Sequence, residues 1–178
     1  MRCRVPYDPV NVNIAIRYRQ LATAHVNIGS NLGDSHALLE RAISGISLLS
    51  VVADLRCSGF IKSEPWGFES AHGFLNVGLE LSVDCGPEEL FRELISVQNG
   101  ICAAGHRGPA GEYADRFIDI DLIYYDDAIV EMPELTLPHP RMHMREFVLL
   151  PIVELSPCWR HPVSGLTAAE MLACLNGG

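Results

Sequence analysis

The clearest pattern in the chain is an alternation of apolar and acidic residues at positions 118–122, which reads Ile-Asp-Ile-Asp-Leu. Side chains two positions apart on a β-strand point to the same face. The pattern therefore predicts a strand with one wholly apolar face and an opposite face that carries Asp119 and Asp121. A strand with such an apolar face is expected to pack on the hydrophobic core.

The two carboxylates of this strand are expected to lie about 6.7 Å apart. At an effective dielectric constant of about 20, they repel each other by roughly 2–3 kcal/mol. A divalent cation between them would remove the repulsion, and magnesium bound to a phosphate substrate needs few protein ligands. An edge strand with a solvated acidic face explains the same residues, so this stretch alone leaves both interpretations open.

The spacing of apolar residues predicts the remaining elements. Further strands are predicted at 25–28, 51–61 and 74–83. Helices are predicted from Asp34 or Ser35 to about 49, from 87 to about 103, at 147–155 and at 167–175. The order strand–helix–strand–strand–helix–strand predicts an α+β fold of the ferredoxin-like βαββαβ type, an antiparallel sheet with packed helices and C-terminal additions. We expect one domain over residues 23–178, preceded by an arm of unknown role at 1–22.

Two apolar aromatic residues, Trp66 and Phe68, fall in the Pro- and Gly-containing loop 63–73. They suit a lid or a stacking platform, and they equally suit a loop tucked onto the core. Asn76 shares a predicted strand face with Phe74. Its amide could hydrogen-bond to the edge of a heterocycle or to neighbouring backbone groups, and both interpretations stay open.

Two connections of the chain are rich in glycine. The turn at 29–33 joins a predicted strand to a helix but lacks the P-loop and dinucleotide fingerprints, so we expect a tight turn. The segment 104–114 is flexible by composition, and its cations are His106 and Arg107.

Composition narrows the class of protein. A chain of 178 residues, 48% hydrophobic and 20% charged, is ordinary for one globular domain. The net charge of −9 argues against a nucleic-acid partner and disfavours an RNA-binding domain of the same fold. The six scattered cysteines are expected to be reduced thiols. No signal peptide and no membrane-spanning run is recognised, so a soluble, cytoplasmic chain without a membrane partner is expected.

Three separated stretches together resemble the 6-hydroxymethyl-7,8-dihydropterin pyrophosphokinase family of the folate pathway. They are HVNIGSNLGD at 25–34, YADRFIDIDL at 113–122 and LPHPRMHMREFVL at 137–149, with Phe-Leu-Asn at 74–76 between them. Their order and spacing make chance similarity improbable. The resemblance runs from about residue 24 to the C-terminus and leaves the N-terminal arm unexplained.

The resemblance implies transfer of the β,γ-diphosphate of ATP to the hydroxymethyl oxygen of the pterin, with release of AMP. ATP and the pterin would be the small-molecule partners, two magnesium ions would take part, and protein partners are unknown. Such a transfer needs charge neutralisation and in-line positioning more than a covalent nucleophile, which suits a pair of aspartates with arginines.

The resemblance also implies roles for individual residues. Asp119 and Asp121 match the metal-binding pair and, with Arg116, the catalytic centre. Phe74 and Phe147 would stack on the two faces of the pterin and Asn76 would bond its edge. The implied pterin contacts are Ser63, Glu64, Trp66, Phe74, Asn76 and Phe147. The implied ATP contacts are Gln98, Tyr113, Arg116, His139 and Arg145. Without the resemblance, we would interpret Arg116 as a surface ion pair with Asp115 and His139 as a turn residue.

The chain departs from the family pattern at the end of the second predicted helix. The family usually has Ile-Glu and, four residues later, Gly-Arg, whereas this chain has Val97-Gln98 and then Cys102-Ala103. Arg107 is the candidate to replace the missing loop arginine, and Tyr113 stands where some members have Trp. A non-catalytic pterin- or nucleotide-binding module on the same fold is therefore the alternative hypothesis.

Overall fold

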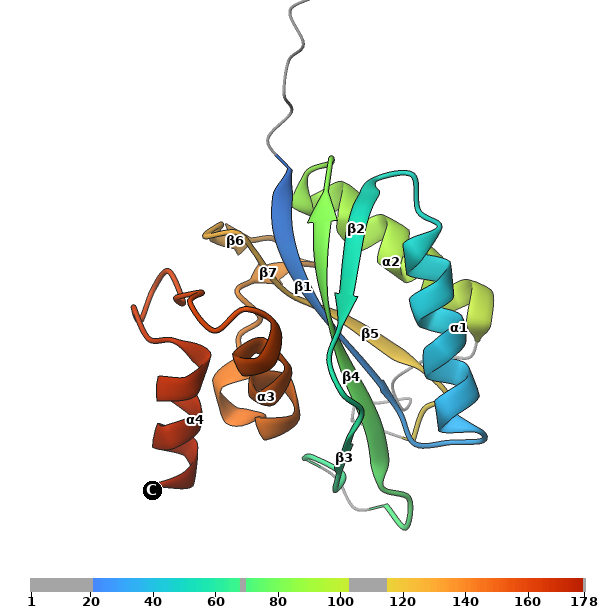
Figure 1. Cartoon of the computed structure of the whole chain (residues 1–178). Coiled ribbons are helices and arrows are strands. Elements are labelled where there is room, and N and C mark those ends of the chain that lie inside the picture. The colour runs from blue at the N-terminus through green and yellow to red at the C-terminus, as the bar shows by residue number, and fades with distance from the viewer. Residues whose placement is uncertain (1–20, 68–69, 103–114, 178) are drawn as a thin grey trace, which may run out of the picture.

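A five-stranded antiparallel sheet organises the chain (Figure 1). The structure is a computed structural model that describes residues 21–67, 70–102 and 115–177. The strands of this sheet are β1 (Ala22–Ser30), β2 (Val52–Cys57), β3 (Ile61–Ser63), β4 (Phe74–Val83) and β5 (Asp119–Tyr125). Their order is β2-β4-β1-β5, and β3 extends the β2 edge by pairing with β4. The α+β class and the antiparallel sheet are therefore as the sequence predicts.

The prediction of a single strand at 51–61 is wrong, because the structure has two strands there, β2 and β3. The break falls at Ser58, whose side-chain oxygen accepts a hydrogen bond of 2.9 Å from the Gly78 amide. The Ser58 amide donates in turn to the Gly78 carbonyl at 2.9 Å. This local side-chain bond replaces the regular ladder and redirects the chain, so that β3 runs into the segment predicted as loop.

Four α-helices of the described chain flank the sheet: α1 (Ser35–Ser47), α2 (Pro87–Ile101), α3 (Glu146–Leu155) and α4 (Ala168–Asn176). Asp34 caps α1 by accepting from the Ala37 amide at 3.1 Å, one of the two predicted caps. Two short strands, β6 (Val130–Glu131) and β7 (Thr136–Leu137), and a 3₁₀ turn η1 (Met142–Met144) connect β5 to α3. Within the described ranges, no helix is both long and apolar enough to cross a bilayer.

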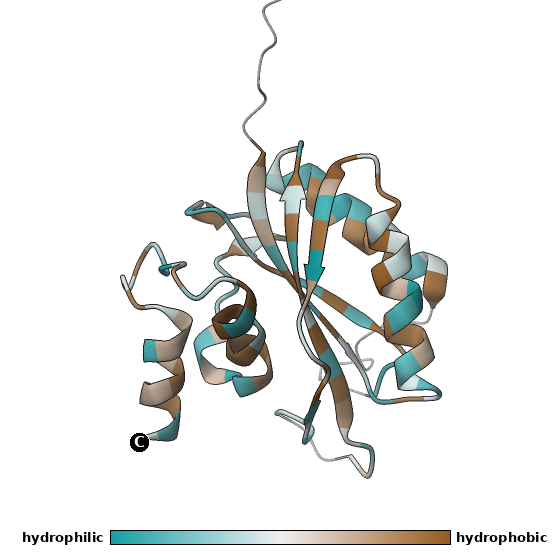
Figure 2. Cartoon of the chain, in the orientation of Figure 1, coloured by the Kyte–Doolittle hydropathy of each residue, from teal (hydrophilic) through white to brown (hydrophobic). Residues whose placement is uncertain are grey.

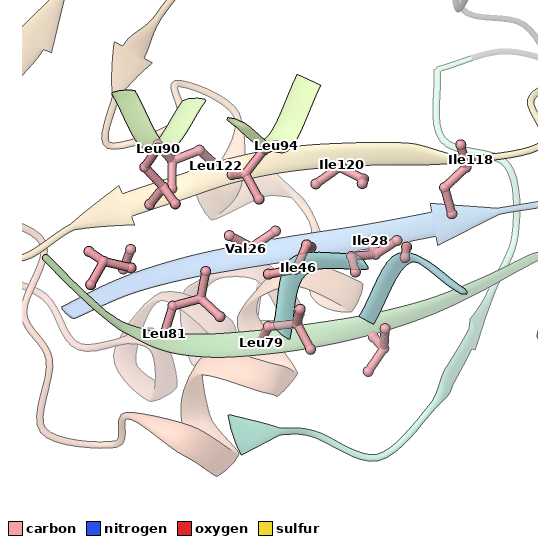
Figure 3. Packing of buried hydrophobic residues seen from close by; sticks show 14 of the residues in the cluster. Val26, Ile28, Ile46, Leu79, Leu81, Leu90, Leu94, Ile118, Ile120 and Leu122 are labelled. Carbon is pink, nitrogen blue, oxygen red and sulfur yellow. The ribbon is translucent and has the colours of Figure 1, made fainter. Parts of the chain in front are cut away.

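The main core lies between the sheet and the pair α1 and α2. Apolar side chains from β1, β4 and β5 meet those of the two helices, as Figure 3 shows for Val26, Leu79, Ile120, Ile46 and Leu94. Ile118, Ile120 and Leu122 are all buried in this core, which confirms the predicted apolar face of β5. Both helices carry alternating hydrophobic and hydrophilic bands, as expected for helices with one buried face (Figure 2).

A second, smaller core lies on the opposite face of the sheet, where α3 and α4 pack together (Figure 1). A β-bulge supplies its sheet residues, since Tyr124 pairs with His25 but Leu122 pairs with Val26, leaving Ile123 as the extra residue. Because of this bulge, Ile123 and Tyr124 both belong to the second core. On this face α3 packs on β4 and β3, and α4 packs on α3 and η1.

Candidate active site

The part of the second face that α3 leaves open carries the candidate site. Strand alternation places Asn27 and Gly29 of β1 beside Asp121 and Asp119 of β5, which are their respective cross-strand partners. On the other side, β4 contributes Asn76, the partner of Gly29. Acidic, amide and glycine positions thus form one continuous floor across three strands.

The cavity above this floor has a volume of about 30 Å³. Its walls come from the loop after β3, the segment before β5 and the start of α3. All six predicted pterin residues line it, as do Arg116, Asp119, Asp121 and Arg145. The remaining lining residues, Asn27 and Gly29, were not predicted as site residues. Segments that are far apart in the sequence therefore converge on one cavity.

The two aspartates of the site each pair with an arginine. The Arg116 guanidinium lies 2.8 Å from Asp119, and the Arg145 guanidinium lies 3.6 Å from Asp121. The two carboxylates are part-exposed, at 24% and 33%, whereas the arginines are more buried. These pairs balance the charge of the carboxylates, which the sequence alone left either to a cation or to solvent.

The pair between Arg116 and Asp115, which was the interpretation without the family resemblance, is not what the structure shows. The Asp115 carboxylate instead accepts a hydrogen bond of 2.6 Å from the Asn31 side chain. Hydrogen bonds from Ser70 and Asn31 lower the pKa of Asp115 below its usual value. Asn31 also accepts from the Arg116 amide at 2.8 Å, so it ties the turn after β1 to the segment that presents Arg116.

Asn31 was missed as a site-building residue. It lies in the Gly-rich turn at 29–33, which is a tight turn as predicted, with Gly33 at a φ of +68°. Its side chain is buried and holds both the residues before β5 and the His72 carbonyl. A buried Asn within a turn is a signal for such a clamp, but the sequence does not show what it holds.

Three aromatic rings of the cavity face the same two arginines. The Arg145 guanidinium carbon lies 4.8 Å from the centre of the Trp66 ring and 5.8 Å from that of Phe147. The Arg116 guanidinium carbon lies 5.6 Å from the Phe74 ring. These are cation–π distances, so each arginine is held by a carboxylate and by an aromatic face at once.

The side chain of Asn76 hydrogen-bonds to the β3 segment and also lines the cavity. Its side-chain nitrogen donates to the Ser63 hydroxyl at 3.0 Å and to the Ile61 carbonyl at 3.4 Å. Its oxygen lies over Gly29, where a Cβ atom would approach it to 2.8 Å. Glycine at position 29 is therefore required for the amide of Asn76 to lie flat against the floor.

Two predicted ATP contacts lie outside the cavity. Gln98 is buried on α2, and its side-chain oxygen accepts a hydrogen bond of 2.5 Å from the Ile120 amide at the β5 edge. His139 donates its backbone amide to Ile123 at 2.7 Å and accepts from the Arg141 amide through Nδ1 at 3.2 Å. Burial lowers the pKa of His139, and the charge of nearby Asp121 opposes this shift. Phe68, Arg107 and Tyr113 lie outside the described residues.

The donor set suits a hard cation that is shared with a phosphate ligand. In the described ranges, no group of three or more His, Cys, Asp or Glu side chains could hold a metal ion. Asp119 and Asp121 are nevertheless two oxygen donors on one strand face at an open cavity. Magnesium typically takes one or two protein carboxylates together with water and substrate phosphates, so the residues present fit this ion.

Comparison with known proteins gives the family. A family model described as 7,8-dihydro-6-hydroxymethylpterin-pyrophosphokinase (HPPK) matches residues 25–157. A 2-amino-4-hydroxy-6-hydroxymethyldihydropteridine pyrophosphokinase of Porphyromonas gingivalis is 37% identical over 143 residues, which cover 80% of this chain and 95% of that protein. An enzyme of the same name from a Synechocystis species is 32% identical over 154 residues, which cover 86% of this chain and 76% of that protein.

Solved structures agree at the level of the fold. The wild-type HPPK-DHPS of Plasmodium falciparum matches with a TM-score of 0.64 and 11% identity, over 86% of this chain. The match spans 44% of that solved chain, so this protein corresponds to less than half of it. Together, the matched family model and the identities to curated relatives place the chain in the 7,8-dihydro-6-hydroxymethylpterin-pyrophosphokinase family of folate-synthesis enzymes.

Proposed function

We propose that this chain transfers the β,γ-diphosphate of ATP to the hydroxymethyl oxygen of 6-hydroxymethyl-7,8-dihydropterin. The observation that carries the proposal is the convergence of three aromatic rings, two carboxylates and two arginines on one cavity. A flat heterocycle needs apolar faces and a polar rim, and a diphosphate needs charge neutralisation. The cavity joins both requirements within one site.

The pterin half of the site consists of rings and amides. Phe74 and Phe147 are proposed to stack on the two faces of the pterin, beside Trp66. Asn76, Ser63 and Glu64 would contact its rim, and the hydrogen bonds of Asn76 to the β3 segment support this role by fixing its orientation. Since the arginines lie over these rings, pterin binding is expected to displace them.

The phosphate half consists of the acidic pair and the arginines. Asp119 and Asp121 are proposed to hold two magnesium ions, which would supply charge neutralisation at the ATP phosphates. Arg116 and Arg145 would then exchange their carboxylate partners for phosphate oxygens. The hydroxymethyl oxygen would form a bond to the β-phosphorus and release its proton to solvent as the bond from that phosphorus to the α–β bridging oxygen breaks, and AMP would leave with that oxygen and the electron pair of the broken bond.

The other predicted contacts remain proposals. Gln98 and His139 would reach ATP from the β5 edge and from below Asp121, and Arg107 and Tyr113 belong to a segment outside the described residues. We also propose that the sheet is of the ferredoxin-like type, that residues 23–178 form one domain after an arm at 1–22, and that the protein is cytoplasmic, without a nucleic-acid partner. The strand order β2-β4-β1-β5 supports the first of these proposals.

The decisive experiment measures AMP release from ATP and magnesium, with and without 6-hydroxymethyl-7,8-dihydropterin. Pterin-dependent AMP is the expected result. The departure at Cys102-Ala103 favours one other candidate, a binding module that no longer supports transfer. Calorimetric binding of both ligands without AMP release would select that module and overturn the proposed transfer.

A further inference from the structure

One polar side chain in the floor of the cavity has no role so far. Asn27 is only 4% exposed, and its side-chain oxygen finds no hydrogen-bond partner among the described residues. A buried acceptor without a partner destabilises the folded chain. It nevertheless lines the cavity, so the missing partner is expected to come from a ligand.

The position of Asn27 on the sheet indicates which ligand would supply the missing hydrogen-bond donor. Its cross-strand partner on β5 is Asp121, and directly opposed residues hold their Cβ atoms about 5 Å apart. Asn76 lies opposite Gly29 and is therefore one step further along the floor. Asn27 thus belongs to the acidic end of the cavity and not to the amide rim proposed for the heterocycle.

No described residue donates a hydrogen bond to the Asn27 oxygen. On β4 its partner is Gly78, which has no side chain and lies beneath Pro151 of α3. The two arginines of the cavity, Arg145 and Arg116, contact the carboxylates and the aromatic rings. The Asn27 oxygen is therefore an acceptor in the cavity lining that no described residue satisfies.

We propose that Asn27 is a positioning residue of the cation site, whose amide oxygen accepts a hydrogen bond from a water molecule carried by the divalent ion at Asp119 and Asp121. Magnesium keeps several of its waters when bound, and such waters are strong donors. Outer partners of this kind orient the ligands of a metal. The inference rests on the proposed function for the presence of the ion, but it concerns a residue that the proposal leaves without a role.

The test replaces Asn27 by Leu, which keeps the size of the side chain and removes both polar atoms. Binding of Mn²⁺ to the full chain is measured by calorimetry in the presence of α,β-methylene-ATP, which cannot undergo the transfer. Loss of an outer partner is expected to weaken Mn²⁺ binding about 10-fold. Thermal stability without ligands should be unchanged or higher, because an unsatisfied acceptor has been removed.

Two further variants sharpen the result. Asn27→Asp keeps an acceptor oxygen but adds a third negative charge, so its melting temperature should fall without Mn²⁺ and recover when Mn²⁺ is added. Thr23→Ala, on the same strand and face but outside the cavity lining, is the control expected to leave Mn²⁺ binding unchanged.

Three outcomes overturn the proposal. Unchanged Mn²⁺ affinity in Asn27→Leu removes the role, and so does a wild-type chain that binds no Mn²⁺ with the analogue. A loss of pterin affinity with Mn²⁺ affinity intact assigns the amide to the heterocycle instead. A wild-type chain that binds Mn²⁺ but releases no AMP contradicts only the proposed transfer, so the two failures are distinguishable.

Discussion

At the scale of single residues, the charged and aromatic side chains of the site contact one another, and ligands can replace these contacts. Asp119 and Asp121 hold Arg116 and Arg145, and the same arginines lie on aromatic rings. The carboxylates, arginines and rings that the proposed reaction needs therefore contact one another. Ligand binding then replaces contacts within the protein by contacts of the same kind with the ligands, without exposing unpaired charge.

The acidic pair gives the first prediction. Asp121→Ala should lower turnover more than about 100-fold, because it removes a metal ligand and not merely an outer partner. The melting temperature should change little, since the lost contact to Arg145 is offset by relief of repulsion from Asp119. Asp127→Ala, in the exposed turn after β5, is the control and should keep both activity and stability. Near-normal turnover of Asp121→Ala would remove the metal assignment.

The stacking ring gives the second prediction. Phe147→Ala should weaken pterin binding about 10-fold or more, since stacking of a flat base on an aromatic ring contributes roughly 1–3 kcal/mol. Calorimetry with the pterin alone measures this effect. Phe60→Ala is a matched control, because Phe60 packs on His36 outside the cavity lining. Equal pterin affinity of Phe147→Ala and the wild-type chain would argue against stacking at this position.

At the scale of elements, the contact between α3 and the sheet sets the shape of the cavity. A Cβ atom at Gly78 would lie 2.2 Å from the Cβ atom of Pro151 and 3.0 Å from Nε2 of His25. No side chain fits there without moving α3, which carries Phe147 in its first turn. The close approach at Gly78 therefore positions the ring proposed to stack on the pterin.

This contact gives the third prediction. Gly78→Ala should destabilise the protein by about 1–3 kcal/mol, as overpacking of a filled core does. Gly100→Ala on α2 is the control, since nothing lies within 4 Å of its Cβ position, and it should stabilise the helix by up to about 1 kcal/mol. Urea unfolding measures both changes. A Gly78→Ala variant as stable as wild type would show that α3 can shift freely.

The elements that the sequence predicts well are those with a strict period. The alternation in β4 and β5 and the helical spacing in α1 and α2 are set by residues that lie within one element. The break at Ser58 was missed because it depends on a hydrogen bond to Gly78, twenty residues away. The same holds for Gln98, whose bond to Ile120 no local pattern reveals. The role of Asn27 was missed because its surroundings are formed by three strands.

At the scale of the whole molecule, the two faces of the sheet have different roles. One face packs on α1 and α2 and builds the main core, whereas the other is shared between the second core and the cavity. The sequence predicts the first face from its alternation. It does not predict how far the C-terminal helices extend over the second face, because that depends on the bulge at Ile123 and on the contact at Gly78.

Burial of His25 under this second layer makes the stability of the whole chain depend on pH. His25 is fully buried against Tyr124, and burial lowers its pKa to about 3. Glu80, its cross-strand partner, does not restore the charge because Arg56 binds it. The unfolded chain binds a proton at His25 below pH 6.5, the ordinary value, whereas the folded chain does not until about pH 3.

The fourth prediction follows from this difference in proton binding. Stability contributed by neutral His25 is fully present above pH 6.5 and is lost as the pH falls toward 3, by up to about 1.4 kcal/mol per pH unit. His25→Phe keeps a ring against Tyr124 and should flatten the unfolding free energy between pH 6 and 4. Part of the slope should remain, because burial also lowers the pKa of His139 and His161. His36→Phe at an exposed position of α1 is the control, and an equal slope in both variants would show that His25 is not the group that titrates.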